Sequence, residues 1–288
     1  LVGSEKQKRK YIPPLASGEM IGAFGLTEAS AGSDAAATKT TAVKKGDEWI
    51  INGSKVFTTN AGEAGVISIT AKVIEDDEEK GIGAFIIETD NPGLRIGPKE
   101  KKMGWNASDT RQIFFEDLQV SDEQRLGEPV DGFRTFLKAL VGGRISVGAL
   151  SCGTAEGAYS AALNYSHERE AFGKPIHKFQ SVGFKLADMA TEIEASKLLV
   201  YQAAKKYDEG HNVVKEAAMA KLFASETAMK TTTEAIQVFG GYGYIKEYPA
   251  ERFFRDAKVL TIGEGTSEIQ KIIILREILK SLDNAISV

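Results

Sequence analysis

Cysteine and histidine are scarce in this sequence, whose 288 residues include one cysteine, Cys152, and three histidines. A single cysteine excludes a disulfide within the chain and is typical of a reducing compartment. Because the histidines are scattered as well, the sequence offers no ligand set for a structural zinc site. No apolar run approaches the roughly 20 residues that span a bilayer, so we expect no transmembrane helix.

A strong excess of one charge sign is also absent, because the formal net charge is only −4. This balance argues against nucleic acid as the main partner. The hydrophobic content of 42% and the charged content of 26% are typical of a soluble protein with one large or two ordinary domains. The chain starts at Leu1, and its first ten residues form neither a signal nor a transit peptide. We therefore expect it to begin within a longer protein, and its EKQKRK stretch to be a solvated helix end.

Several common catalytic motifs are missing. No G-x-G-x-x-G follows a strand-like stretch, so a Rossmann dinucleotide site is not indicated. The sequence GKP at 173–175 lacks the other residues of a phosphate loop, and HEREA at 167–171 lacks the second histidine of a zinc protease. There is no G-x-S-x-G elbow. These absences argue against nucleotide-hydrolysing and common hydrolytic enzymes.

The first half of the chain, from about residue 20 to 120, has the pattern of short strands. Runs rich in Ile, Val, Phe and Thr alternate with Gly, Asn, Asp and Pro, which is typical of antiparallel β structure. No amphipathic helices separate the runs, so a parallel βαβ sheet is not supported. EDDEEKG at 75–81 is most simply a charged hairpin loop. The predicted strands are MIGAFGLTE, WIINGSKVFTT, VISITAKVI, GAFIIET and RQIFFEDLQV.

The second half has helical periodicity. We predict helices over about 131–166, 182–207 and 212–239, with a last helix from Ser267. Ser267 and Gln270 have the spacing of a capping box. Gly153 and Gly157 would permit close helix packing. Residues that recur every three or four positions predict one apolar seam on the second of these helices, formed by Val182, Leu186, Met189, Ile193, Ser196, Val200, Ala203 and Tyr207. The last helix is predicted to have a buried stripe of Ile269, Ile272, Ile273, Ile278, Leu279 and Leu282.

These patterns predict an α+β fold, with an antiparallel sheet or barrel-like domain in residues 1–124 and a four-helix bundle in residues 125–288. Small polar and glycine clusters punctuate both halves: FGLTEASAGSD, VFTTNAG, REAFGKP, VFGGYGY and GEGTSE. In the last cluster, Glu264 lies between two glycines directly before a helix start. A turn before a capped helix would explain this stretch by itself, since most glutamates are solvated surface charges.

The clusters, in this order, resemble motifs of the acyl-CoA dehydrogenase family of flavoproteins. The similarity runs from about Tyr11 to Leu279 and includes GLTEASAGSD, HEREAFGKPI, QVFGGYGY and RDAKVLTIGEGTSEIQ. The short- and medium-chain branch, like butyryl-CoA dehydrogenase, is most similar. The resemblance implies FAD as cofactor and α,β-dehydrogenation of an acyl-CoA thioester to a trans-2-enoyl-CoA. It also implies electron-transferring flavoprotein as acceptor, a homotetramer built as a dimer of dimers, and the bacterial cytoplasm or the mitochondrial matrix as compartment.

The resemblance makes Glu264 the general base that removes the pro-R α-proton while a β-hydride passes to flavin N5. A base in a dry pocket has a raised pKa, which brings its strength closer to that task. The backbone N–H of Glu264 and a ribityl hydroxyl of the flavin would hold the developing enolate oxygen. Flanking glycines would let the backbone approach both ligands. The substrate contacts implied by the family are Ser33, Arg144 and Gly265.

The cofactor residues follow from the same resemblance. The first loop would lie along the flavin, with Thr27 near its pyrimidine edge, and the VFTT stretch would pack on the isoalloxazine and reach N5. The REAFGKP region would surround the pyrophosphate and adenine, and the VFGG region would reach the FAD of a neighbouring subunit. The final helix start suits a phosphate-bearing ligand. The expected set is Phe24, Leu26, Thr27, Ser33, Phe57, Thr58, Thr59, Arg169, Phe172, Phe179, Gln180, Gln237, Val238, Phe239, Gly240, Gly241, Thr266 and Glu268.

The sequence departs from the family pattern in several ways. The N-terminal helical domain that normally walls the acyl pocket is not present in this sequence. Val141 stands where many relatives have an aspartate near Arg144, so contacts with the CoA portion would differ. Phe57 replaces a common tryptophan and can still stack, but it lacks the indole N–H. Gly263 replaces a frequent tyrosine and would widen the pocket floor, and Ala29 replaces a frequent proline.

Two alternatives stay open at this point. An acyl-CoA oxidase would share the chemistry but pass electrons to oxygen, and hydrogen peroxide formed on turnover would identify it. A non-catalytic acyl-CoA-binding or assembly homologue is the other, and a protein that stays colourless with added FAD would favour it.

Overall fold

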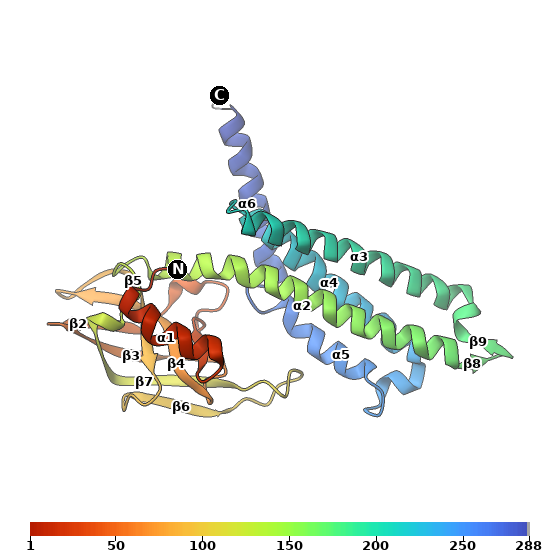
Figure 1. The fold of residues 1–288 in the computed structure, drawn as a ribbon, viewed down its shortest axis with the longest axis horizontal. Helices are drawn as coiled ribbons and strands as arrows, with labels where there is room; N and C mark the ends of the chain where they lie inside the picture. The colour runs from red at the N-terminus through yellow and green to blue at the C-terminus, as the bar shows by residue number, and fades with distance from the viewer. Residues whose placement is uncertain (287–288) are drawn as a thin grey trace. The chain divides into compact units, whose positions relative to one another are not determined.

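The computed structural model describes residues 1–286, which form two compact units that are described separately here. The β unit comprises Leu1–Lys102 and Asn106–Ala139, and the helical unit comprises Met103–Trp105 and the residues from Leu140 onward. Each can be followed by its labels in Figure 1. The predicted α+β order, a sheet followed by helices, is confirmed. The domain division after residue 124 stays a prediction.

The β unit is built on one seven-stranded sheet, and all five predicted strands are present. The prediction missed two strands, β2 and β6, because lysine, arginine, glycine or proline interrupts the apolar residues of their sequences TAVKK and LRIGPK. The elements are α1 (Glu5–Ser17), β1 (Ile21–Gly25), η1 (Ala35–Ala37), β2 (Thr41–Lys45), β3 (Glu48–Thr59), β4 (Ala64–Glu75), β5 (Glu78–Glu88), β6 (Leu94–Lys99), β7 (Thr110–Ser121) and η2 (Asp122–Gln124).

The sheet is mixed rather than antiparallel, which corrects the prediction. One edge of β4 pairs with β5, while β1 and β2 pair with its other edge in parallel, at residues 64–69 and 72–74. A βαβ unit joins two consecutive parallel strands through a helix, whereas other strands lie between these parallel partners along the chain. The strand order begins with β5, followed by β4. Both β1 and β2 lie beside β4, and β2 continues the sheet through β3 and β7 to β6. The path has two ends, so the described strands do not close a barrel.

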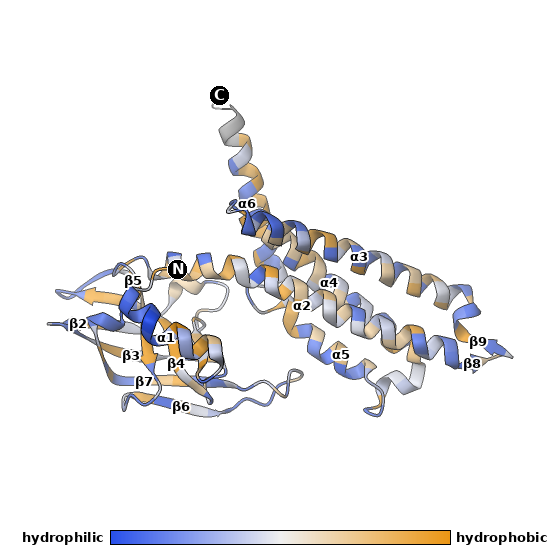
Figure 2. Cartoon of the chain, viewed as in Figure 1, coloured by the Kyte–Doolittle hydropathy of each residue, from blue (hydrophilic) through white to orange (hydrophobic). Residues whose placement is uncertain are grey.

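The core of the β unit lies on one face of this sheet. Alternate residues of β3 are buried, including Trp49 and Ile51, as period-two patterning requires. Strand β4 has buried residues on both of its faces and no exposed ones, and α1 covers part of the second face by packing Tyr11 against Val66 and Ile86. The EKQKRK stretch forms the start of α1 and is exposed except for Gln7, which is buried and makes a capping box with Ser4. Figure 2 shows the first part of α1 in hydrophilic blue and orange residues along β3 and β4.

The helical unit contains the four predicted helices together with shorter elements that were not predicted. The bounds are α2 (Gly132–Glu168), which begins within the β unit, β8 (Glu170–Ala171), β9 (Lys174–Pro175), η3 (Ile176–Lys178), α3 (Gln180–Asp208), α4 (Val214–Phe239), η4 (Gly240–Tyr244), α5 (Ala250–Ala257), η5 (Lys258–Thr261) and α6 (Ser267–Ile286).

The predicted seam along α3 is confirmed for its six central residues. Leu186, Met189, Ile193, Ser196, Val200 and Ala203 are all buried. Val182 is partly buried against the same core, and Tyr207 at the end of the helix is exposed. Alanines of α2 and α4 complete these clusters, so the helices pack closely. Gly157 contributes to this packing by facing Phe253, whereas an added Cβ at Gly153 would meet no atom within 4 Å.

The prediction for α6 was wrong in two respects. Of its expected stripe only Ile273 is buried and Ile269 half-buried, while Ile272, Ile278, Leu279 and Leu282 are exposed. The reason is that the C-terminal part of α6 extends away from the other helices of its unit, as Figure 1 shows. The helix is also capped by Thr266, whose hydroxyl accepts from the Ile269 N–H at 3.3 Å, and not by Ser267.

The length and composition of α2 would allow it to cross a membrane, with a mean hydropathy of 1.2 over its most apolar window. The sequence analysis did not identify this window, and its expectation of no transmembrane helix stays a prediction. One such helix is weak support for a membrane span, because core helices often have the same character.

A short segment between β6 and β7 belongs to the helical unit. The backbone N–H of Trp105 donates to the Asp256 carboxylate at 2.6 Å, and its indole N–H donates to the Asp256 carbonyl at 3.0 Å. Arg255 donates to the Met103 carbonyl at 2.9 Å. A Cβ at Gly104 would lie 2.6 Å from the Arg255 carbonyl oxygen, so only glycine fits between them.

Candidate active site

Glu264 is held in an unusual backbone conformation. Its φ is +56° and that of the following Gly265 is +94°, so two consecutive residues lie in the left-handed region that disfavours a side chain. One carboxylate oxygen, Oε2, is buried and has no hydrogen-bond partner among the described residues. Burial raises the pKa of Glu264, while the nearby charges of Arg144 and Lys221 lower it by less. Strain and an unpaired carboxylate together indicate a functional group.

Arg144 of α2 provides a buried positive charge near this carboxylate. It is 5% exposed, and its Nε atom is buried without a hydrogen-bond partner among the described residues. Burial lowers the pKa of Arg144, and the Glu264 charge opposes this shift. Buried donors of this kind in native proteins normally pair with a ligand, an ion or an ordered water. The pair can therefore bind a polar ligand and exchange a proton with it.

The elbow at 263–266 is fixed by side chains that the sequence analysis did not identify. Lys221 of α4 donates to the Gly265 carbonyl at 2.8 Å. The Gln270 amide donates to the carbonyls of Glu264 and Gly265, at 3.1 and 2.9 Å. A signal for Lys221 was present, because it is the one charged residue in the otherwise uncharged stretch AAMAKLFAS.

Gly143 of α2 leaves space for the Glu264 carboxylate. A Cβ added at Gly143 of α2 would lie 2.9 Å from Glu264 Oε2, which would push the carboxylate aside. An added Cβ at Gly263 would meet only the Val259 carbonyl oxygen, at 3.5 Å, so there is room beside the elbow where the family often has tyrosine. Val141, which stands where the resemblance implies an aspartate, is half-buried in α2.

We expect Gly143→Ala to lower the rate of any reaction that depends on Glu264 by about 10- to 100-fold, because misplacement of a reacting group by about 1 Å costs on this order. The protein should not be destabilised, since alanine in a helix interior gains about 0.5–1 kcal/mol over glycine. Gly153→Ala is the matched control on the same helix, where the methyl group meets no neighbour. Thermal unfolding and substrate-dependent rates measured on both variants test this. Equal rates in the two would contradict it.

In the β unit, a buried ion pair supports the first predicted cofactor loop. Lys55 of β3 is fully buried and its Nζ lies 2.7 Å from Glu28 Oε1. Glu28 also accepts from the Lys39 N–H at 2.6 Å, from the Thr40 N–H at 3.0 Å and from the Thr38 hydroxyl. Burial alone would raise the pKa of Glu28, but these donors outweigh it and lower the pKa to about 2. The sequence analysis did not identify this pair.

The loop that the ion pair supports carries Leu26, Thr27 and Ser33. Leu26 and Thr27 are half-buried, and Ser33 is exposed. The Thr27 carbonyl accepts from the Val56 N–H at 2.8 Å, which joins the loop to β3. Phe24, at the start of this region, is 38% exposed and stacks on Phe136 with ring centroids 4.8 Å apart.

A bulge in β3 presents the second predicted cofactor stretch. The register with β7 shifts between Lys55 and Thr58, and Phe57 has a φ of +58°. Phe57 is 67% exposed, Thr59 is exposed, and Thr58 is buried with its hydroxyl lacking a partner among the described residues. Bulges commonly redirect side chains at functional sites. An exposed aromatic ring beside an unpaired hydroxyl suits a flat polar ligand.

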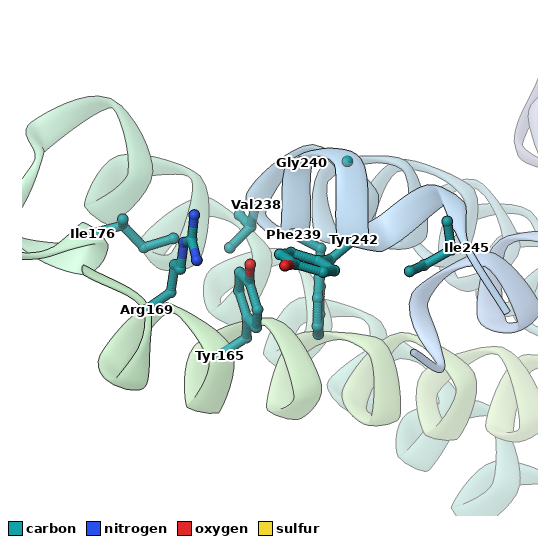
Figure 3. Close-up of a pocket in the computed structure, with 9 residues that line it drawn as sticks. Tyr165, Arg169, Ile176, Val238, Phe239, Gly240, Tyr242 and Ile245 are labelled. Atoms are coloured by element: carbon teal, nitrogen blue, oxygen red, sulfur yellow. The ribbon is translucent and has the colours of Figure 1, made fainter. Parts of the chain in front are cut away.

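The helical unit contains a cavity of about 560 Å³ that brings together several predicted residues. Arg169 lines it from the end of α2, and Val238 to Gly241 line it from the end of α4. Figure 3 shows Tyr165 and Arg169 facing Val238, Phe239 and Tyr242. Stacking of Tyr165 on Phe239, with centroids 4.2 Å apart, holds the two segments together. Tyr165, Ile176, Tyr242 and Ile245 were not predicted.

Other predicted residues lie outside this lining. Phe172 and Gly173, with φ of +52° and +77°, form the two-residue turn between β8 and β9, and Phe172 is 95% exposed. Phe179 is half-buried against Phe172 in an edge-on contact, while Gln180 and Gln237 are exposed. Thr266 and Glu268 lie at the start of α6, away from this cavity's lining. Among the residues that the structure describes, no group of His, Cys, Asp or Glu could hold a metal ion.

Two family models match the chain. The acyl-CoA dehydrogenase middle domain matches residues 23–118, and the acyl-CoA dehydrogenase C-terminal domain matches residues 130–279. The short-chain specific acyl-CoA dehydrogenase of Clostridium acetobutylicum is 48% identical over 278 residues, which are 96% of this chain and 73% of that protein.

Two solved structures are also similar to this chain. Butyryl-CoA dehydrogenase from Megasphaera elsdenii aligns with a TM-score of 0.93 and 48% identity, covering 96% of this chain and 73% of that chain. A chain from work on the electron transferring flavoprotein of Acidaminococcus fermentans and flavin-based electron bifurcation aligns with a TM-score of 0.93 and 50% identity, with the same coverage.

Proposed function

Since the chain belongs to the acyl-CoA dehydrogenase family and is an oxidoreductase, we propose that it oxidises short- or medium-chain acyl-CoA thioesters to trans-2-enoyl-CoA with FAD, and passes the electrons to electron-transferring flavoprotein. The observation that carries this proposal is the buried Glu264 Oε2 atom, which has no hydrogen-bond partner among the described residues, on its glycine-flanked elbow.

Glu264 acts as the general base that takes the α-proton of the thioester. Its raised pKa brings it closer to the strength that proton abstraction requires. Its backbone N–H donates to the thioester oxygen as negative charge develops there. Arg144, Ser33 and Gly265 contact the substrate, with the arginine and serine toward its CoA portion. FAD, when bound, supplies the acceptor for the β-hydride.

Each unit, taken by itself, contains residues that we propose bind FAD. Phe24, Leu26, Thr27, Ser33 and the bulge at Phe57–Thr59 suit the flavin, because the bulge presents an exposed ring and the unpaired Thr58 hydroxyl. The cavity with Arg169 and Val238–Gly241 suits the dinucleotide end, since it combines a guanidinium with aromatic walls. Phe172, Phe179, Gln180, Gln237, Thr266 and Glu268 complete the proposed set.

The finer assignments have separate support. The similarity to a short-chain specific enzyme and to a butyryl-CoA dehydrogenase supports a short acyl chain. The similar chain from the electron transferring flavoprotein work supports that electron acceptor. The exposed apolar residues of α6 are consistent with a homotetramer, since large exposed apolar patches mark contact surfaces.

The flavin absorption spectrum tests the proposal. We expect the purified protein to be yellow and to bleach anaerobically with butyryl-CoA, and to bleach more slowly with long-chain acyl-CoAs. Turnover with electron-transferring flavoprotein and little hydrogen peroxide in air would exclude an oxidase. A protein that stays colourless with added FAD, or a flavin that no acyl-CoA bleaches, would refute the proposal.

We expect Thr58→Val to weaken FAD binding by about 2- to 10-fold, the value of one hydrogen bond. The FAD-free protein should lose less than about 0.5 kcal/mol of unfolding free energy, because the hydroxyl has no partner in the described chain. Thr40→Val is the matched control, since that buried hydroxyl donates to the Ser54 carbonyl and its loss should cost about 1 kcal/mol. FAD titration and urea unfolding measure both. A Thr58→Val protein that binds FAD normally would remove Thr58 from the set.

A further inference from the structure

Lys221 is a lysine in a position where packing alone would favour an apolar side chain. It is fully buried in α4, among alanines and hydroxyl residues that face the neighbouring helices. Burying an ammonium group is costly unless it is paired. Its contact is the Gly265 carbonyl, at 2.8 Å, one residue after Glu264. Burial lowers the pKa of Lys221 to about 8, so the group is mostly charged at neutral pH.

The same carbonyl receives a second donor from α6. The Gln270 amide lies 2.9 Å from the Gly265 oxygen and 3.1 Å from the Glu264 oxygen, and Gln270 is fully buried. A third contact joins α4 to the start of α6, because the Ser267 hydroxyl donates to Glu226 at 2.5 Å. Two helices therefore hold a backbone segment whose left-handed conformation is unfavourable for glutamate.

We propose that Lys221 is the positioning residue for the base: through the Gly265 carbonyl, and together with Gln270, it fixes the elbow so that the Glu264 carboxylate and N–H keep their places. This inference rests on the proposed role of Glu264. Lys221 also contributes a positive charge that favours the ionised form of Glu264. The other charged groups around this pair are Arg144 from α2, Glu226 from α4 and Glu268 from α6.

Lys221→Met tests the inference, because methionine keeps the length and removes the donor and the charge. In the FAD-loaded protein, the limiting rate of flavin bleaching by butyryl-CoA should fall about 10- to 100-fold, while the half-saturating substrate concentration changes little. The acid limb of the pH–rate profile should move to higher pH, since loss of a nearby cation raises the pKa of Glu264. The flavin spectrum should be retained.

Hydrogen exchange supplies a measurement that does not depend on activity. Peptides spanning residues 261–270 should exchange faster in Lys221→Met than in the unmodified protein. Val200→Ala is the control, because it removes bulk from the cluster that packs on Ala220 and Ala224 of the same helix without touching the elbow carbonyls. This control should lose stability but keep the pH–rate profile.

Each outcome decides the inference. An unchanged limiting rate, an unmoved pH profile, or exchange at 261–270 no faster than in Val200→Ala would overturn it. If Lys221→Met does not fold, Gln270→Met removes the second donor to the same carbonyl and must give the same fall in limiting rate and the same faster exchange at 261–270, while the pH–rate profile stays in place because glutamine carries no charge. If the unmodified protein does not bleach with any acyl-CoA, the proposed function fails, and the exchange measurement still decides whether Lys221 fixes the elbow.

Discussion

Replacing Glu264 with glutamine should lower the rate of substrate-dependent flavin bleaching by at least about 100- to 10,000-fold, the usual contribution of a general base. The flavin should remain bound, since the elbow backbone is held by Lys221 and Gln270 and not by the carboxylate. Anaerobic stopped-flow absorbance with butyryl-CoA measures the rate. A variant that bleaches at the original rate would show that another group takes the proton.

The same substitution should raise the stability of the protein at neutral pH. Burial raises the pKa of Glu264 in the folded state above its unfolded value. The stability that this group contributes is therefore fully present below the unfolded pKa and is lost as pH rises through the folded pKa. Glutamine has a similar shape and no charge to desolvate, so thermal unfolding near pH 8 should occur at a higher temperature. Glu194→Gln, on an exposed face of α3, should change neither rate nor stability.

Replacing Lys55 with methionine should destabilise the β unit by about 3–5 kcal/mol, because it leaves the Glu28 carboxylate buried without its cation. Urea unfolding of the FAD-free protein measures this loss. Lys72→Met is the matched control, since Lys72 also pairs with a glutamate from a strand, at 2.9 Å, but Glu79 is half exposed and such pairs contribute at most about 1 kcal/mol.

The double variant Lys55→Met with Glu28→Gln should recover much of this loss, because it removes both charges. The pH dependence of the unmodified protein follows from the lowered pKa of Glu28. Stability from this carboxylate is present above its unfolded pKa of about 4.5 and is lost as pH falls toward about 2. A loss no larger than that of Lys72→Met would mean that solvent reaches the pair.

Local patterns in the sequence predict most of the fold. A run rich in Ile, Val, Phe and Thr identifies β3, and the three-and-four spacing of apolar residues identifies α3, whose buried face packs on a core. The parallel pairing of β1 and β2 with β4 was not predictable, since it joins strands that are distant along the chain. The apolar residues of α6 have the pattern of a buried stripe, and periodicity does not indicate whether a core lies beside them.

Sequence motifs mark part of the candidate site, whereas the distant residues that support it have no motif. Glu264 stands out between two glycines, and Arg169 and Gly240 lie in recognisable clusters. Lys55 and Glu28 are 27 residues apart and Lys221 and Gly265 are 44 apart, and each pair forms only through tertiary packing. Charged residues that become buried have no local pattern of their own, so the groups that fix the site appear only in the structure.

The hydrogen bonds of Trp105 have a consequence for the order in which the chain acquires its structure during synthesis. Its partner Asp256 follows 151 residues later, so the connection between β6 and β7 cannot reach its final contacts until α5 has left the ribosome. At about 5–20 residues per second, this delay is on the order of ten seconds. The strands on either side can pair during that time, while Gly104 and its neighbours have not yet formed their contacts with α5. We expect this connection to be cleaved by proteases in nascent or truncated chains that end before α5, and to be protected in the finished protein.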